Sequence, residues 1–409
     1  MKKALSVLAG AVLAATLCSC SNVTTQPSAN NTQVSFTKAN VASNYIKGAD
    51  ISELLEMEQK GIVYKDQNGV ATDALKILKD NGVNYVRIRL WNDPKDANGK
   101  EYGAGNDDLA TVTKLAKRAK DLGMKFLLDF HYSDFWTDPG KQFKPKAWEN
   151  LSYEELQVAI HDYTRDVIKS LKAAGCMPDM VQVGNEITGG FLWPTGKSWG
   201  IDTPQQEFDR LSTLLKSAIK GLDEAKGDSE VKVMLHLDKG TKKDQYKWWF
   251  DEITKRNVPF DVIGMSLYPF WDGPIDNCIE NIKFVKQTYG KDVIIAEASW
   301  PYTTENDDRV PNSPSEAEAL IGGYNPTVEG QYSFLKDTME KTEQAGAYGI
   351  FYWGTTWKAG PGITWATQAG IDYIKDKCGT SCPPGNSREN HALFDKEGKV
   401  LPSIKVFNN

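Results

Sequence analysis

The chain has 409 residues, of which 40% are hydrophobic and 25% charged, and this is the composition of an ordinary globular protein. The formal net charge is −6 and no long basic run follows the first residues, which argues against nucleic acid as a partner. The 12 tryptophans are compatible with either core packing or a cleft whose indoles stack on sugar rings.

The N-terminus has the pattern of a bacterial export signal. Lys2 and Lys3 carry positive charge, and residues 4–17 form an apolar stretch that is too short for a normal membrane span. Leu17-Cys18-Ser19-Cys20 resembles a lipobox, so residues 1–20 are predicted to be a lipoprotein signal peptide with Cys20 as the lipidated residue. Lipidation at Cys18, or an ordinary signal peptide cut nearby, are the alternatives.

Residues 21–44 are rich in Ser, Thr and Asn and are predicted to be a flexible tether. One lipid and a tether would hold a folded domain at a membrane, here the outer membrane, at the cell surface or on the periplasmic side. Cys378 and Cys382 are close enough in sequence for a small disulfide in an oxidising compartment, whereas Cys176 and Cys278 are expected to be buried thiols.

From residue 45 onward, short apolar runs alternate with amphipathic stretches, and no break in composition marks a second domain. The predicted strands are Ile46–Ile51, Tyr85–Leu90, Lys125–His131, Met180–Glu186, Val231–Leu237, Val262–Leu267, Val293–Glu297 and Gly349–Trp353. The predicted helices are Ala71–Asn81, Asp107–Leu122, Tyr153–Ala174, Pro204–Ala225, Asp244–Lys255, Ile275–Tyr289 and Thr327–Gln344.

Strands that are separated by helices predict a parallel sheet, and eight such repeats predict closure into a (β/α)₈ TIM barrel over residues 45–409. The alternative is an open doubly wound sheet, but the Gly-rich turn typical of that fold does not follow the first strand. Four long connections, residues 91–105, 132–150, 187–202 and 300–326, all follow strand ends. In a barrel they would share one rim, which is where such folds carry their chemistry.

Two glutamates, Glu186 and Glu297, end the fourth and seventh predicted strands. Two carboxylates that meet at a barrel rim are sufficient to cleave a glycosidic bond, one as general acid and one as nucleophile. Taken singly, each could instead be a surface glutamate that caps the next helix. Asn185, beside Glu186, is expected to hold a sugar hydroxyl.

Other polar side chains at the strand ends are candidates for supporting roles. Arg87 and Arg89 share one face of their strand and are expected to point toward Glu297, or else to form structural ion pairs. Asp129 and His131 likewise share a face. The remaining candidate substrate contacts are Asp134, Tyr268, which would also donate to Glu297, Trp353, which would form the floor of the subsite where the bond breaks, and the tryptophans Trp91, Trp136, Trp193, Trp300 and Trp357.

Residues 306–312 offer oxygen ligands at every second position: Asn306, Asp308, the Val310 carbonyl and Asn312. Alternating oxygen atoms on a tight loop are one way in which proteins hold Ca²⁺. The spacing alone favours an ordinary polar loop.

Several segments are similar to those of the endo-β-1,4-galactanases of glycoside hydrolase family 53. They are Gly48–Ser52, Tyr85–Trp91, Asp129–Trp136, Val183–Glu186, Ser266–Trp271, Ala296–Glu297 and Ala392–Asp395, and the resemblance extends over residues 45–407. The stretches Asp-Phe-His-Tyr-Ser-Asp and Asn-Glu-Ile-Thr are its most specific parts.

This resemblance implies a (β/α)₈ fold and hydrolysis of β-1,4-galactan, as in type I arabinogalactan, with retention. It assigns Glu186 as acid/base and Glu297 as nucleophile. It also implies a calcium ion at Asn306, Asp308, Val310 and Asn312, with Asn386 and Glu389 as further ligands, and the chain is expected to act as a monomer. Two alternatives stay open: a mannanase, xylanase or cellulase with the same pair of glutamates, and a glycan-binding protein without turnover.

Overall fold

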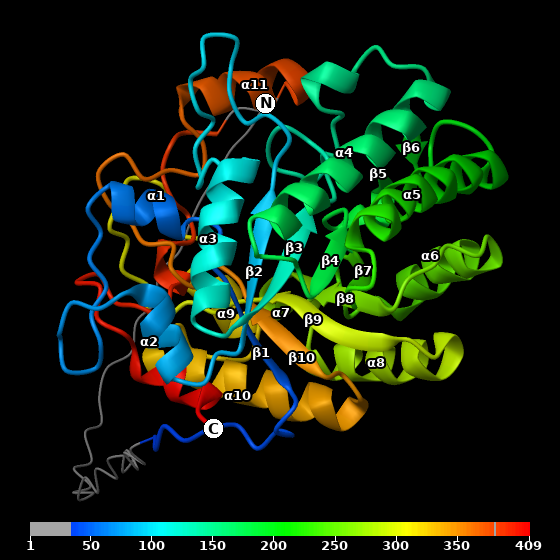
Figure 1. Cartoon of the computed structure of the whole chain (residues 1–409). Helices are drawn as coiled ribbons and strands as arrows, with labels where there is room; N and C mark the ends of the chain where they lie inside the picture. The colour runs from blue at the N-terminus through cyan, green and yellow to red at the C-terminus, as the bar shows by residue number, and fades with distance from the viewer. Residues whose placement is uncertain (1–33, 380–381) are drawn as a thin grey trace, which may run out of the picture. The chain divides into compact units, whose positions relative to one another are not determined.

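A computed structural model describes residues 34–379 and 382–409. Eight parallel strands close into a barrel in the order β1-β10-β9-β8-β7-β4-β3-β2, and helices pack around its outside (Figure 1). Because neighbours along the chain are neighbours around the barrel, each strand is followed by a return crossover on the outer surface. The predicted (β/α)₈ fold is confirmed.

The barrel strands lie close to the predicted runs, and the differences fall at their ends. They are β1 Ile46–Asp50, β2 Tyr85–Leu90, β3 Lys125–Phe130, β4 Met180–Val183, β7 Lys232–Leu237, β8 Val262–Ser266, β9 Asp292–Ala298 and β10 Gly349–Tyr352. β4 stops three residues before Glu186 because Gly184 takes a φ of +87°, which turns the backbone out of the sheet. A separate two-stranded sheet, β5 (Gly190–Phe191) and β6 (Gly196–Lys197), follows β4.

In the part of the chain that the structure describes, seven α-helices correspond to predicted ones and four were not expected. The former are α2 Ala74–Asp80, α3 Leu109–Asp121, α4 Tyr153–Ala173, α5 Pro204–Lys226, α6 Lys243–Lys255, α8 Ile275–Tyr289 and α10 Val328–Ala345. The latter are α1 Leu54–Gln59, α7 Pro269–Asp272, α9 Glu316–Ile321 and α11 Gln368–Cys378. No helix within the described ranges is both long enough and apolar enough to cross a membrane.

The interior of the barrel is layered along its axis. An apolar cluster that includes Tyr85, Leu127 and Met234 fills its lower part, and Tyr85 packs edge-on against Phe351 at 5.4 Å. Two residues further along β2 and β3, the same inward face carries Arg87 and Asp129, because side chains alternate with period two. The polar layer therefore lies at the C-terminal rim, over an apolar floor.

The segment before β1 is bound to the bottom of the barrel. The Ala39 amide donates to the Val406 carbonyl at 2.9 Å, and the Asn40 amide donates to Glu340 of α10 at 2.7 Å. The tether predicted over residues 21–44 is therefore too long at its C-terminal end. Residues 1–20 and Cys20 lie outside the described residues.

The cysteines behave only in part as expected. Cys176 and Cys278 are buried thiols. Cys378 and Cys382 are exposed and free, so the disulfide that their spacing allows is not formed in this structure.

Gln331 of α10 ties the helix layer to the rim. Its fully buried side-chain amide donates to the Trp300 carbonyl at 3.0 Å and to the Tyr352 hydroxyl at 3.0 Å, and its oxygen accepts from Ser403 at 2.5 Å. A buried amide with both ends bonded stabilises the fold because its partners have no water to replace it.

We expect Gln331→Leu to lower the free energy of unfolding by about 3 kcal/mol, since it leaves several buried polar groups unpaired. Denaturant titration would measure this loss. Gln368→Leu, on the exposed side of α11, is the control and should change stability by less than about 0.5 kcal/mol. Equal stabilities of the two variants would contradict the role assigned to Gln331.

Candidate active site

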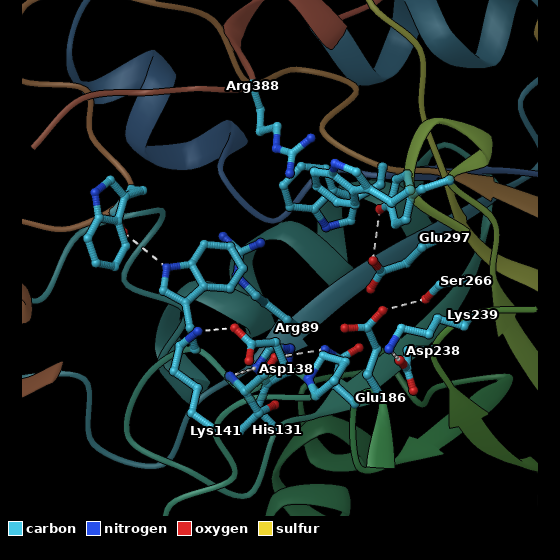
Figure 2. Close-up of a pocket in the computed structure, with 18 of the residues that line it drawn as sticks. Arg89, His131, Asp138, Lys141, Glu186, Asp238, Lys239, Ser266, Glu297 and Arg388 are labelled. Atoms are coloured by element: carbon cyan, nitrogen blue, oxygen red, sulfur yellow. Dashed lines mark hydrogen bonds and ion pairs between the residues drawn. The ribbon is translucent and has the colours of Figure 1, made fainter. Parts of the chain in front are cut away.

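A cavity of about 760 Å³ opens at the C-terminal rim of the barrel. Residues on or just after seven of the eight barrel strands line it, which is the arrangement that lets (β/α)₈ barrels build sites from separate strands and loops. Figure 2 shows Glu186 and Glu297 in this cavity with their carboxylates turned toward one another.

Glu186 reaches the cavity through an unusual backbone conformation. The residue has a φ of +50°, in the left-handed region that non-glycine residues seldom adopt. This conformation follows the turn at Gly184 and begins the 3₁₀ turn Ile187–Gly189. Strained backbone of this kind persists at sites where the surrounding structure requires it.

Glu297, on β9, is held by a cation and a hydroxyl. Arg87 Nη2 lies 2.9 Å from Glu297 Oε1, and the Tyr268 hydroxyl donates to Oε2 at 2.9 Å. Both partners stabilise the ionised carboxylate. The predicted donation from Tyr268 and the predicted contact from Arg87 are present.

Arg87 is the centre of a buried ion network. Its guanidinium also contacts Asp50 at 2.9 Å, Asp129 at 2.8 Å and the side-chain oxygen of Asn185 at 2.9 Å. These groups are almost completely shielded from water, so their charges are retained only because they are paired. The network fixes Glu297 and Asn185 relative to one another.

Among the described residues Glu186 forms no ion pair, and its nearest polar partner is a hydroxyl that is backed by an imidazole. The Ser266 hydroxyl donates to Glu186 Oε1 at 2.6 Å, and His236 Nε2 lies 2.9 Å from the same hydroxyl. Burial holds the pKa of His236 well below its ordinary value, so the ring is neutral and supplies no charge to Glu186.

The two glutamates therefore differ in their affinity for a proton. Burial, reinforced by the negative charges of Glu297 and Asp238, raises the pKa of Glu186 well above its ordinary value. Burial also raises the pKa of Glu297, but Arg87 and the Tyr268 hydrogen bond oppose that rise. When the pair holds one proton, the proton lies on Glu186.

Tryptophans form one wall of the cavity. The rings of Trp136 and Trp357 stack with centroids 6.0 Å apart, and Trp353 packs edge-on against Trp357 at 5.7 Å. The Arg89 guanidinium lies 4.1 Å from the centroid of the Trp136 ring and is paired with Glu53 at 2.8 Å. Arg89 therefore supports this wall through a cation–π contact, which is a contact that the sequence did not reveal.

The structure brings most of the predicted site residues to the cavity. Those that line it are Glu186, Glu297, Asn185, Arg87, Arg89, His131, Tyr268, Trp353, Trp136 and Trp357. His131 is held in place by Asp129 at 3.2 Å and by the Trp91 indole N–H at 3.2 Å.

Four residues predicted to contact substrate do not line the cavity, because their side chains are buried away from it. Trp91 and Trp300 are fully shielded from water and pack among core aromatics, and Asp129 is enclosed by Arg87 and His131. Asp134 accepts from the Asp93 amide at 3.0 Å and so fixes a loop. Trp193 also lies outside the cavity lining.

Several residues at the cavity were missed. Ser266 lines the cavity, and His236 is buried behind it with Nε2 2.9 Å from the Ser266 hydroxyl. Each lies two residues before a residue that lines the cavity, Tyr268 or Asp238, so counting back by two along the chain would have found them. The other missed lining residues are Thr137, Asp138, Pro139, Lys141, Asp238, Lys239, Trp271, Asp272, Trp365, Cys382, Ser387 and Arg388. Most of them come from loops whose sequence has no regular pattern, and Trp271 and Asp272 lie on the short helix α7.

The predicted calcium ligands lie on two loops that contact one another. Asp308 Oδ2 accepts from the Asn386 amide at 2.6 Å, and Glu389 accepts from the Asp307 amide. One buried oxygen of Asn312 and one of Glu389 have no hydrogen-bond partner among the described residues, which fits a cation at this junction.

Two other predicted ligands fit less well. The side-chain oxygen of Asn386 accepts from the Arg388 amide at 3.0 Å, and the side-chain oxygen of Asn306 accepts from the Asp308 amide at 3.0 Å. Both carboxylate oxygens of Asp308 and the Val310 carbonyl also accept hydrogen bonds, from the Val310 amide, the Asn386 amide and the Asn306 side chain. Of the predicted ligands, the oxygens best placed for a metal are therefore those of Asn312 and Glu389, with the charged carboxylate of Asp308 beside Glu389.

A closed (β/α)₈ barrel with two facing strand-end glutamates beside a tryptophan wall defines a glycoside hydrolase. The sequence profile of glycosyl hydrolase family 53 matches residues 46–407, and the chain belongs to this family.

The same relationship is seen in individual proteins. The chain is 37% identical to the endo-β-1,4-galactanase of Bacillus subtilis, with 89% of this chain and 85% of that protein covered. It is 34% identical to the arabinogalactan endo-β-1,4-galactanase of Cellvibrio japonicus, with 90% and 92% covered. The solved catalytic domain of the family from Ignisphaera aggregans superposes with a TM-score of 0.83 at 40% identity, with 91% and 97% covered.

We expect Tyr268→Phe to move the acidic limb of the pH–rate profile to higher pH. The lost hydrogen bond stabilises ionised Glu297, so its removal raises the pKa of that carboxyl and less of it is ionised at a given low pH. kcat should fall by about 10- to 100-fold, because this corresponds to the free energy that a hydrogen bond to a charged group contributes.

Ser266→Ala is the matched variant on the other glutamate. Loss of its hydrogen bond raises the pKa of Glu186, so the alkaline limb should move to higher pH while the acidic limb stays in place. If both variants moved the same limb, the two carboxyls would not act as separate acid and nucleophile.

Proposed function

We propose that the protein is a retaining endo-β-1,4-galactanase that cleaves galactan chains such as those of type I arabinogalactan. The observation that carries the proposal is the facing pair, Glu186 and Glu297, with a buried arginine in contact with Glu297. The substrate class is supported by the family and by the galactanases that the chain resembles over most of its length.

The reaction follows from the charges of the pair. Ionised Glu297 attacks the anomeric carbon while protonated Glu186 gives its proton to the departing glycosidic oxygen. Glu186, now ionised, takes a proton from water, whose oxygen attacks the same carbon and releases Glu297. Two displacements at one carbon retain the anomeric configuration.

The tryptophan wall and the polar side chains of the rim contribute different contacts to substrate binding. Trp136, Trp353 and Trp357 offer apolar surfaces to the sugar ring, and Asn185 and His131 offer hydrogen bonds to its hydroxyls. Because Asn185 is fixed by Arg87, a hydroxyl bound there is positioned relative to Glu297.

The substrate is tested by product analysis on a panel of β-1,4 glycans. Galactan should release short oligosaccharides, and mannan, xylan and cellulose should not, with β-anomers appearing first by NMR. Faster release from mannan or xylan would replace the proposed substrate with that glycan, and tight binding without products would indicate a binding protein.

We expect Glu297→Ala to lower kcat on galactan by about 10⁴-fold or more, because no nucleophile remains. Glu186→Ala should lower it by about 10²- to 10⁴-fold. With a dinitrophenyl galactobioside, whose leaving group needs no proton, Glu186→Ala alone should show a burst of dinitrophenol followed by slow turnover.

Glu154→Ala, an exposed position on α4, is the control and should keep the wild-type rate. Wild-type rates for Glu297→Ala, or a burst from that variant and none from Glu186→Ala, would contradict the assignment.

We propose that the junction of residues 306–312 with residues 386–389 holds a structural Ca²⁺. One buried side-chain oxygen of Asn312 and one of Glu389 have no hydrogen-bond partner among the described residues, which supports the proposal. The carboxylate of Asp308, which contacts the Asn386 amide, adds a negative charge at the same junction. An ion there would join the loop after β9 to the loop that carries Arg388 into the cavity wall.

We expect calcium to raise the melting temperature, with about 2.7 kcal/mol gained at a concentration one hundred times Kd. Chelation should lower it reversibly, and Mg²⁺ should not substitute, because it prefers a tighter octahedral shell. Differential scanning fluorimetry is the measurement. An unchanged response in Asp308→Ala combined with Asn312→Ala would place the ion elsewhere.

We propose that the chain is exported and anchored to the outer membrane by a lipid on Cys20. The support is the lipobox-like sequence after a charged and apolar N-terminus. Wild-type protein should partition into the detergent phase of Triton X-114, and Cys20→Ala should remain in the aqueous phase, whereas Cys18→Ala should behave as wild type. Detergent partitioning of Cys20→Ala would contradict the assignment.

A further inference from the structure

Two tryptophans lie exposed beside one another on the outside of the barrel, apart from the residues that line the cavity. Trp199 is 46% exposed and Trp248 38%, and their ring centroids are 5.8 Å apart. Ile201, 49% exposed, is two residues from Trp199. Large apolar side chains that gather at a surface mark binding sites, whereas single exposed ones do not.

The two rings are held in fixed positions. Trp248 packs edge-on against Phe208 at 5.2 Å, and Phe208 is covered by Arg256, which is paired with Asp209 at 2.7 Å. Trp199 lies against Gly189, where even an added Cβ would come within 3.3 Å of its ring. A ligand that binds here therefore loses little free energy to ordering of the protein.

Both tryptophans lie on segments that are linked, by sequence or by hydrogen bonds, to residues of the cavity. Gly189 follows the acid/base candidate Glu186 by three residues. On the other side, Gln245 of α6 donates to Thr188 at 3.2 Å and to the carbonyl of Asp238 at 3.1 Å, and Asp238 lines the cavity. The tryptophan pair is thus continuous with the β4 and β7 side of the catalytic rim, where α5 and α6 lie side by side (Figure 1).

We propose that Trp199 and Trp248 form a second binding surface, a flank platform, for a β-1,4-galactan chain. The proposal rests on the proposed function and adds a place that holds the polymer outside the cavity. A galactose ring has one face made of C–H groups, because its axial O4 lies toward the other face, and indole binds such apolar faces.

The size of the patch supports a glycan over a protein partner. Stable association of two chains buries about 800 Å² on each partner, whereas a few aromatic side chains present a small part of that area. A sugar chain needs only one ring for each indole. A β-1,4-galactan chain is also uncharged, so it can bind to two uncharged indole rings without a charged side chain.

The test compares Trp199→Ala/Trp248→Ala with Trp199→Phe/Trp248→Phe. Retention of each variant by soluble polymeric galactan in native gels is measured in a Glu297→Gln background, so that the chain is not cut. Hydrolysis of a β-1,4-galactotetraose is measured in the active background. Val158→Ala, at a 60% exposed apolar position on α4, is the matched surface control.

The alanine pair should weaken retention by at least about fivefold, as expected for loss of two aromatic contacts. The phenylalanine pair should keep most of the retention. kcat/KM on the tetraose should change by less than about twofold, because a short chain occupies the cavity alone.

Unchanged retention of the alanine pair would overturn the proposal, and so would an equal loss on the tetraose, which would place the effect in the cavity. A change in oligomeric state with unchanged retention would assign the patch to a second copy of the chain. If the wild type does not cut galactan but cuts or is retained by another glycan, the proposed substrate fails, and the variants then test the platform with that glycan.

Discussion

The buried charge of Arg87 is the interaction on which the site depends. A guanidinium enclosed by protein is stable only with carboxylate partners, and Asp50, Asp129 and Glu297 supply them. These partners come from β1, β3 and β9, so one side chain joins three strands across the top of the barrel. The ion pair between Arg87 and Glu297 stabilises the buried guanidinium and also keeps Glu297 ionised. The fold and the reaction therefore both depend on this contact.

The barrel separates this polar layer from the apolar layer beneath it. The inward positions two residues earlier on the same strands, Tyr85 and Leu127, are packed with apolar neighbours. Such a floor excludes water from below, so the charges above it interact strongly. The difference between Glu186 and Glu297 then depends on which of them has a cation beside it.

The sequence was sufficient to predict the regular parts of the structure, which are the alternating strands and helices and the residues at their ends. Alternation of apolar runs and helical periods was sufficient for the barrel. The strand-end rule placed Glu186, Glu297 and Tyr268 at the cavity, and the period-two alternation of β2 placed Arg87 there. The same rule was wrong for Trp300, which follows its strand end but turns into the core. Strand position determines which rim a residue joins, whereas the path of the following loop determines which way its side chain faces.

Arg388 and Lys141 could not have been predicted for a related reason. They reach the cavity from loops, and a loop's path depends on tertiary contacts such as the one between Asn386 and Asp308. The helices α7 and α9 were not predicted because each is too short for the helical periodicity of apolar residues to be recognised.

The attachment of residues 37–42 to α10 and to the C-terminal segment bears on how the molecule meets a polymer. This segment enters β1 at Ile46, the end of the strand opposite the catalytic rim, and Figure 1 shows it beside the C-terminus. Attachment of the protein to a surface through this segment would involve the end of the barrel that is opposite the cavity. The cavity at the C-terminal rim would then face away from that surface and remain accessible to long glycan chains.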